Sequence, residues 1–154
     1  MSRFYFVAVV LVIGILAGTG VAVGAPLGLF LNVPSLILVV APTLLLVAAN
    51  FTVREIGTCF SISFRREGAR RIDLELARVF FSALGRYLGL IGSIGALIGL
   101  IELLATLGDS AAIGSGVALA LMTALYGLIL YVAVVIPFQA GIRRRIAEAD
   151  FAGR

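Results

Sequence analysis

Among the polar side chains inside long apolar stretches of this chain are Ser93, Thr123 and Glu102. A carboxyl group within an apolar run is a candidate proton or cation site, because a charge is costly to place in lipid. A hydroxyl group there can hydrogen-bond a water molecule or an ion-carrying group inside a helix bundle. Glu102 also has a structural interpretation, since it stands ~24 Å beyond Arg86 along a helix and so reaches the outer edge of the hydrocarbon.

Small residues recur around Ser93 and Thr123 at helical spacing. Spacings of three and four put small residues on one side of each helix, where they let two backbones approach closely. The pattern predicts two helix-packing faces, each with one hydroxyl group, and two helices that line a narrow space. The residues are Gly89, Gly92, Gly95, Ala96 and Gly99 in the first stretch, and Gly116, Ala120, Ala124 and Gly127 in the second.

The composition excludes several kinds of chemistry. The sequence contains no histidine, one cysteine and only 8 acidic residues. A disulfide or a zinc site is therefore not expected, and no pair of nucleophile and base can be proposed. We expect no enzymatic activity, no cofactor and no metal site. Nucleic-acid binding is also disfavoured, because arginine beside apolar spans is the ordinary signal of membrane orientation.

The elements that position these residues are predicted to be membrane helices. Of the 154 residues, 62% are hydrophobic and 13% are charged, and a membrane span needs about 20 mainly apolar residues. The predicted fold is an all-α integral membrane protein with a single membrane domain over residues 1–154. The four predicted spans are 4–23, 34–51, 84–107 and 111–139.

Arginine gathers in two places, the segment 52–83 with the start of the third span, and the tail 140–154. By the positive-inside rule both lie in the cytoplasm, and so do both termini. The segment 52–83 is too short to bury a core of its own, and its second half, 65–85, is predicted to be a helix that continues into the third span. The apolar face predicted for this helix consists of Ile72, Leu76, Phe80 and Leu84.

Three of the four spans resemble one family of membrane proteins. The stretch GRYLGLIGSIGALIGL at 85–100 resembles the glycine-rich third span of the MotA/TolQ/ExbB proton-channel family. The stretch AIGSGVALALMTALYGLIL at 112–130 resembles the channel-lining fourth span of the flagellar stator branch, and VPSLILVVAPTL at 33–44 is similar to a segment of the same branch. The matches occur in the order of the family.

The resemblance implies an oligomeric state, a partner protein and a location in the cell. In the family, five copies of such a subunit surround two copies of a single-span MotB/TolR/ExbD-like partner in the bacterial inner membrane, and H⁺ or Na⁺ passes by way of an aspartate of the partner. Ser93 takes the position of a threonine in the third span. Ala124 takes that of the fourth-span threonine, so Thr123 lies one residue earlier, about 100° around the helix. Arg86 replaces a proline of the stator branch, and Asn32 an aspartate.

The sequence therefore predicts an ion-conducting subunit of a proton- or sodium-driven membrane motor. In this prediction Ser93 and Thr123 line the ion route, and Glu102 collects ions at its outer mouth. The third and fourth helices line an oligomeric pore. The alternative is a membrane scaffold or assembly protein, whose glycine faces only pack helices. The short segment 52–83 favours the scaffold, while the three motif matches favour the channel. A conventional flagellar stator is not expected, because the family's large cytoplasmic domain is missing.

Overall fold

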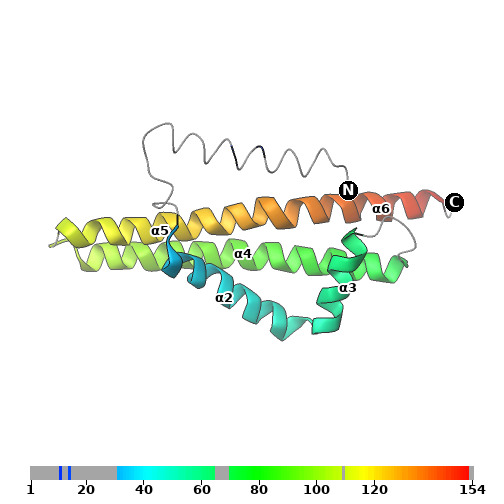
Figure 1. The fold of residues 1–154 in the computed structure, drawn as a ribbon, viewed down its shortest axis with the longest axis horizontal. Helices are drawn as coiled ribbons and strands as arrows, with labels where there is room; N and C mark the ends of the chain where they lie inside the picture. The colour runs from blue at the N-terminus through cyan, green and yellow to red at the C-terminus, as the bar shows by residue number, and fades with distance from the viewer. Residues whose placement is uncertain (1–10, 12–13, 15–30, 65–69, 109, 153–154) are drawn as a thin grey trace.

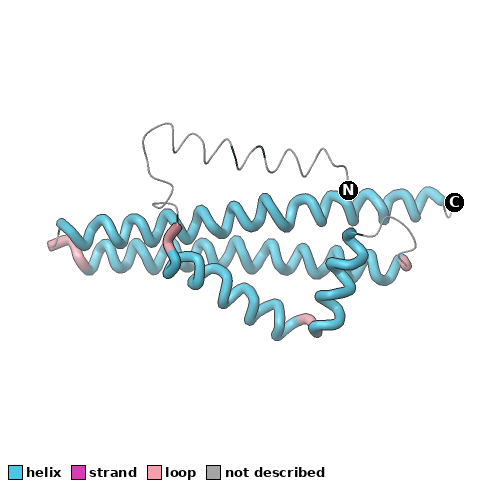
Figure 2. The backbone as a smooth tube through the Cα atoms, in the orientation of Figure 1, coloured by secondary structure: helices cyan, strands magenta, loops and turns pink. Residues whose placement is uncertain are grey.

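The computed structural model describes residues 11, 14, 31–64, 70–108 and 110–152. This part of the chain is helical with short connections and contains no strand (Figure 2). Three helical stretches are long and apolar enough to cross a membrane, at Val33–Asn50, Arg71–Ala105 and Ile113–Ala149. The all-helical membrane fold is thus confirmed for the described residues. The predicted first span, 4–23, lies outside them except for Leu11 and Gly14.

The two longest helical stretches form an antiparallel hairpin (Figure 1). Its first leg is α4 (Arg71–Ala105), and its second leg begins with α5 (Ser110–Leu130). We call the end at the turn between them the tip, and the opposite end the base. The prediction that a helix leads from the polar segment straight into the third span is confirmed, although α4 begins at Arg71 and residues 65–69 lie outside the description.

The second leg continues through a wide turn into a further helix. The turn is η2 (Tyr131–Val135), a π-helix, and the leg ends with α6 (Ile136–Ala152). The N–H of Ile136 donates to the carbonyl of Tyr131, five residues back. Pro137 explains the wide turn, because its ring crowds the carbonyl four residues earlier and it has no N–H to donate. The leg thus extends well beyond residue 139, where the fourth span was predicted to end.

The helix α2 (Val33–Asn50) starts against the half of the hairpin nearer the tip and runs obliquely to it toward the base (Figure 1). Asn32 caps it, because the Asn32 side chain accepts a hydrogen bond of 3.1 Å from the N–H of Ser35. The N–H of Asn32 in turn donates to the hydroxyl of Tyr126 on α5 at 2.8 Å. These bonds fix the start of α2 on the hairpin, and its buried face is Ser35, Val39, Thr43 and Val47.

A short helix, α3 (Val53–Phe64), was not predicted. It packs against α4 and α6 at the base, and segment 52–83 contributes there to a core that it shares with α2 and α6. The extension of α6 supplies the third wall of this core. The predicted apolar face is correct in part: Phe80 is buried and Leu76 and Leu84 pack against the core, but Ile72 is 72% exposed and Leu74 is buried instead. The core contains Val47, Cys59, Ile62, Leu74, Ala77, Phe80, Phe81, Ile142 and Ile146.

Candidate functional site

The two legs of the hairpin contact each other through small residues. Gly99 lies against the backbone of α5, and a Cβ added at Gly116 would come 2.7 Å from the backbone nitrogen of Leu103. A Cβ added at Gly127 would lie 3.3 Å from the Cα of Gly92. Only glycine allows backbones to come this close, so these residues act as a packing surface within one subunit.

A groove opens along one side of this contact. Its volume is about 390 Å³. Most of its wall is made of the small residues that the sequence pattern singled out, and the wall is apolar apart from the hydroxyl group of Ser93. The lining residues are Leu88, Gly89, Gly92, Ser93, Ala96 and Leu97 from α4, and Ala124, Gly127 and Leu128 from α5.

The two predicted hydroxyl groups do not lie together. Ser93 is exposed in the groove, and its hydroxyl donates to the carbonyl of Gly89 at 2.9 Å. Thr123 is fully buried, against Gly95 of α4. Its hydroxyl donates to two carbonyls of its own helix, at 2.8 and 3.0 Å. Ala124 is therefore the residue that shares the groove with Ser93, and the place of Thr123 on an ion route stays a prediction.

Glu102 lies apart from the groove. It is exposed on α4 near the tip, and nine residues of α-helix place it about 180° around the axis from Ser93. Both interpretations of this carboxyl group, ion entry site and contact with the outer interface, are compatible with that position. In the described part of the chain, no group of three histidine, cysteine or acidic side chains is placed to hold a metal ion.

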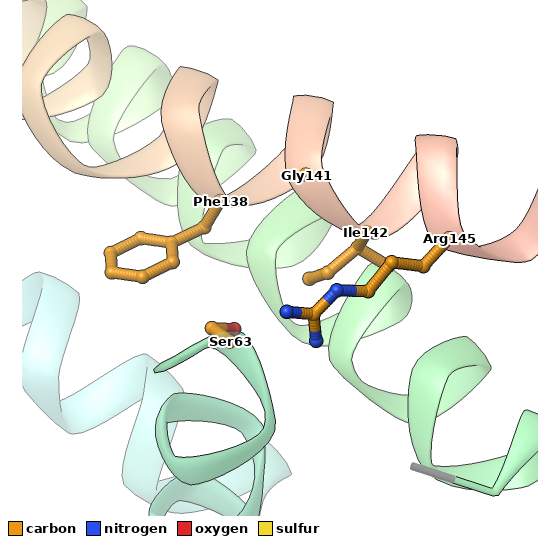
Figure 3. Close-up of a pocket in the computed structure, with 5 residues that line it drawn as sticks. All are labelled: Ser63, Phe138, Gly141, Ile142 and Arg145. Atoms are coloured by element: carbon orange, nitrogen blue, oxygen red, sulfur yellow. The ribbon is translucent and has the colours of Figure 1, made fainter. Parts of the chain in front are cut away.

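At the base, α6 holds the end of α3. One terminal nitrogen of Arg145 donates to the carbonyl oxygen of Ile62 at 2.7 Å, and Figure 3 shows the Arg145 side chain reaching toward the end of α3 beside Ser63. The bond satisfies one of the carbonyls that the last turn of a helix leaves without a partner. The cavity between Ser63, Phe138 and Ile142 measures only about 10 Å³, room for one water molecule.

Cys59 belongs to the core at the base and is buried there. Burial raises the pKa of its thiol to about 11, and the nearby carboxylate of Glu55 adds to the shift. The pKa of Glu55 is itself lowered, because the N–H and the hydroxyl of Thr52 both donate to its carboxylate. The thiolate is the reactive form of cysteine, so Cys59 is unreactive at neutral pH while α3 stays packed.

Charge is distributed unevenly along the hairpin. The arginines of the described residues all lie toward the base, whereas Glu102 lies near the tip. Some of these arginines pair with carboxylates of their own helix or its cap. Such pairs include Arg70 with Asp73 at 3.1 Å, Arg78 with Glu75 at 3.6 Å and Arg144 with Glu148 at 3.4 Å. Exposed pairs of this kind contribute little to stability, so the base presents a basic surface.

The basal contact could not be predicted from the sequence, because Arg145 and Ile62 are 83 residues apart. The leucines that complete the groove were not predicted either; they are Leu88, Leu97 and Leu128. An apolar residue in an apolar span carries no signal that separates a groove wall from a lipid-facing surface. Only the packing of α4 against α5 shows which side of each helix stays open.

These features define a helical membrane protein built around a hairpin of small residues with an open groove. Comparison with known proteins agrees with this class. Residues 63–150, more than half of the chain, match the MotA/TolQ/ExbB proton channel family. The chain belongs to this family, which is a family of channels and not one of known enzymes.

One curated relative is Motility protein A of Aquifex aeolicus (strain VF5). It is 56% identical over 53 residues, which are 34% of this chain and 21% of that protein. The chain therefore matches about a fifth of the length of this relative.

Proposed function

We propose that this chain is an ion-conducting subunit of an ion-driven membrane complex, in which the groove of α4 and α5 faces the helix of a single-span partner. The observation that carries the proposal is the groove itself. It lies in the part of the chain that matches the channel family. Its wall of small residues leaves room for the side chains of another helix, and it exposes Ser93.

The arginines at the base of the hairpin support an orientation with this end in the cytoplasm. Arginine near the ends of membrane spans stays on the cytoplasmic side, and the described arginines lie at the base. Ions then cross from the tip to the base. The transmembrane potential supplies ~2.3 kcal/mol per charge per 100 mV for this movement. The membrane in this proposal is the cytoplasmic membrane of a bacterium.

The groove is better suited to a proton than to a sodium ion. An ion that sheds its water needs a ring of oxygen ligands. The groove offers one side-chain oxygen, that of Ser93, which already donates to the carbonyl of Gly89. A proton needs no such ring when it travels on a carboxyl group. The described residues place no carboxyl group in the groove, so we assign that group to the partner.

Filling the groove tests the proposal. Ala96→Leu places a larger side chain in the groove, whereas Ala105→Leu makes the same change on an exposed position of the same helix. In vesicles that contain the complex, we expect Ala96→Leu to lower proton flux about tenfold or more, and Ala105→Leu to leave it unchanged. Equal flux in Ala96→Leu and the wild type would show that the groove is not the route.

The assembly can be measured separately. Five copies of this chain with two copies of a single-span protein are expected in native mass spectrometry of the complex, extracted in mild detergent after co-expression with the neighbouring genes. A monomer or dimer without such a partner would contradict the proposed complex.

One observation favours the scaffold as the second candidate. The contact between α4 and α5 already occupies Gly92, Gly99, Gly116 and Gly127, so helix packing alone explains many of the small residues. A scaffold needs no open groove, however, and would conduct no ions. The proton-flux measurement therefore separates the two candidates.

A further inference from the structure

Arg86 continues the line of groove residues toward the base. It precedes Gly89 by three residues and Ser93 by seven on the unbroken helix α4. Seven residues of α-helix place Arg86 on nearly the same face as Ser93, about 20° around the axis and about 10 Å along it. The side chain is exposed in the subunit. A positive charge therefore stands at the basal end of the groove.

The described residues give Arg86 no hydrogen bond and no ion pair. The neighbouring Arg78, by contrast, pairs with Glu75 on the same helix. A residue that only fixes membrane orientation can point anywhere toward the headgroups, but the face of Arg86 is the one that carries Gly89 and Ser93. Its guanidinium carries a positive charge.

We propose that Arg86 is an electrostatic barrier at the basal end of the groove, which keeps hydrated cations from leaking through while a proton passes on a carboxyl group of the partner. The inference rests on the proposed function. A fixed positive charge repels Na⁺ or K⁺ strongly where little water screens it, and arginine excludes cations from other narrow pores in this way. A protonated carboxyl group has no net charge and does not meet this barrier.

The test compares two ion fluxes in the same vesicles. Cells express the full chain with the genes beside it, and vesicles from their membranes receive Na⁺ and H⁺ gradients in separate runs. We expect Arg86→Gln to raise Na⁺ leak about tenfold or more. Arg86→Lys keeps the charge and should restore the wild-type leak. Arg78→Gln removes an arginine of the same helix that lies outside the groove, and should leave the leak unchanged.

The outcomes separate this inference from the proposed function. If the wild type conducts protons, Ala96→Leu blocks them and Arg86→Gln leaks no more Na⁺ than the wild type, the barrier is refuted and the channel stands. If Arg78→Gln leaks as much as Arg86→Gln, general loss of basic charge explains the effect and the barrier is again refuted. A wild type that conducts no protons overturns the proposed function and the barrier with it. Equal amounts of assembled protein are verified by size-exclusion chromatography.

Discussion

Replacing Gly116 by alanine tests whether the hairpin depends on close backbone contact. The added Cβ would lie 2.7 Å from the backbone nitrogen and 2.8 Å from the Cα of Leu103. Carbon atoms prefer separations of about 3.5 to 4 Å, and backbone atoms cannot swing aside as a side chain can. The two helices must therefore move apart by up to about 1 Å, which loosens their contact over several turns.

The magnitude follows from two opposing effects. Overpacking costs about 1 to 3 kcal/mol, whereas alanine in place of glycine favours a helix by about 1 kcal/mol. The net loss of stability for Gly116→Ala is therefore up to about 2 kcal/mol. Gly114 offers a matched control two residues away, because no described atom lies within 4 Å of a Cβ added there. Gly114→Ala should therefore gain up to about 1 kcal/mol.

Thermal unfolding in detergent can measure this difference with a thiol-reactive dye. Cys59 is the sole cysteine of the sequence and is buried, so the dye reports its exposure. At about 2 to 4 °C per kcal/mol for a chain of this size, Gly116→Ala should unfold at a lower temperature than the wild type and Gly114→Ala at an equal or higher one. A Gly116→Ala variant that unfolds at the same temperature as Gly114→Ala, or at a higher one, would refute the close-contact argument.

Further predictions concern the base and the buried hydroxyl. Arg145→Gln removes a charge-assisted hydrogen bond to the carbonyl of Ile62, which should lower the free energy of opening α3 by about 1.4 kcal/mol. Maleimide should then label Cys59 about ten times faster. Unchanged labelling would show that the bond does not hold α3. Because the folded-state pKa of Cys59 is raised from 9.0 to about 11, its contribution to stability should be complete below pH 9 and fall as the pH rises toward 11. Cys59→Ser, as the comparison in chemical denaturation, should lose this pH dependence. Thr123→Val should leave proton flux unchanged, because its hydroxyl bonds to its own helix, and a fall in flux would place Thr123 on the route.

Hydropathy predicted the spans well where an apolar run is long and uninterrupted. The second span was expected at 34–51, where the structure has the helix Val33–Asn50, and the third was expected at 84–107, where α4 runs to Ala105. The helix α3 escaped prediction because its twelve residues mix polar and apolar types and depend on contacts with α4 and α6. Such a helix is stabilised by tertiary packing, which the local sequence does not record.

The residue types of the site were predicted from the sequence, but the face of each helix that opens to the groove was not. Spacing placed Thr123 on the face of Gly116 and Gly127, and all three are buried together. Since small residues cover more than one face of each helix, spacing alone could not show which face packs within the subunit and which one opens to the groove. The packing of α4 against α5 shows this, and places Ala124 beside Ser93 in the groove.

The wide turn η2 also affects how this chain can be compared with its relatives. In a regular α-helix Ile146 would lie about 100° around the axis from Gly127, yet both are buried. The five-residue hydrogen-bond spacing at Tyr131–Val135 absorbs this rotation. The turn thus has the form of a one-residue insertion. An alignment with a relative that has a regular helix here needs a gap at this point, and without the gap the whole of α6 would be matched to the wrong helical positions.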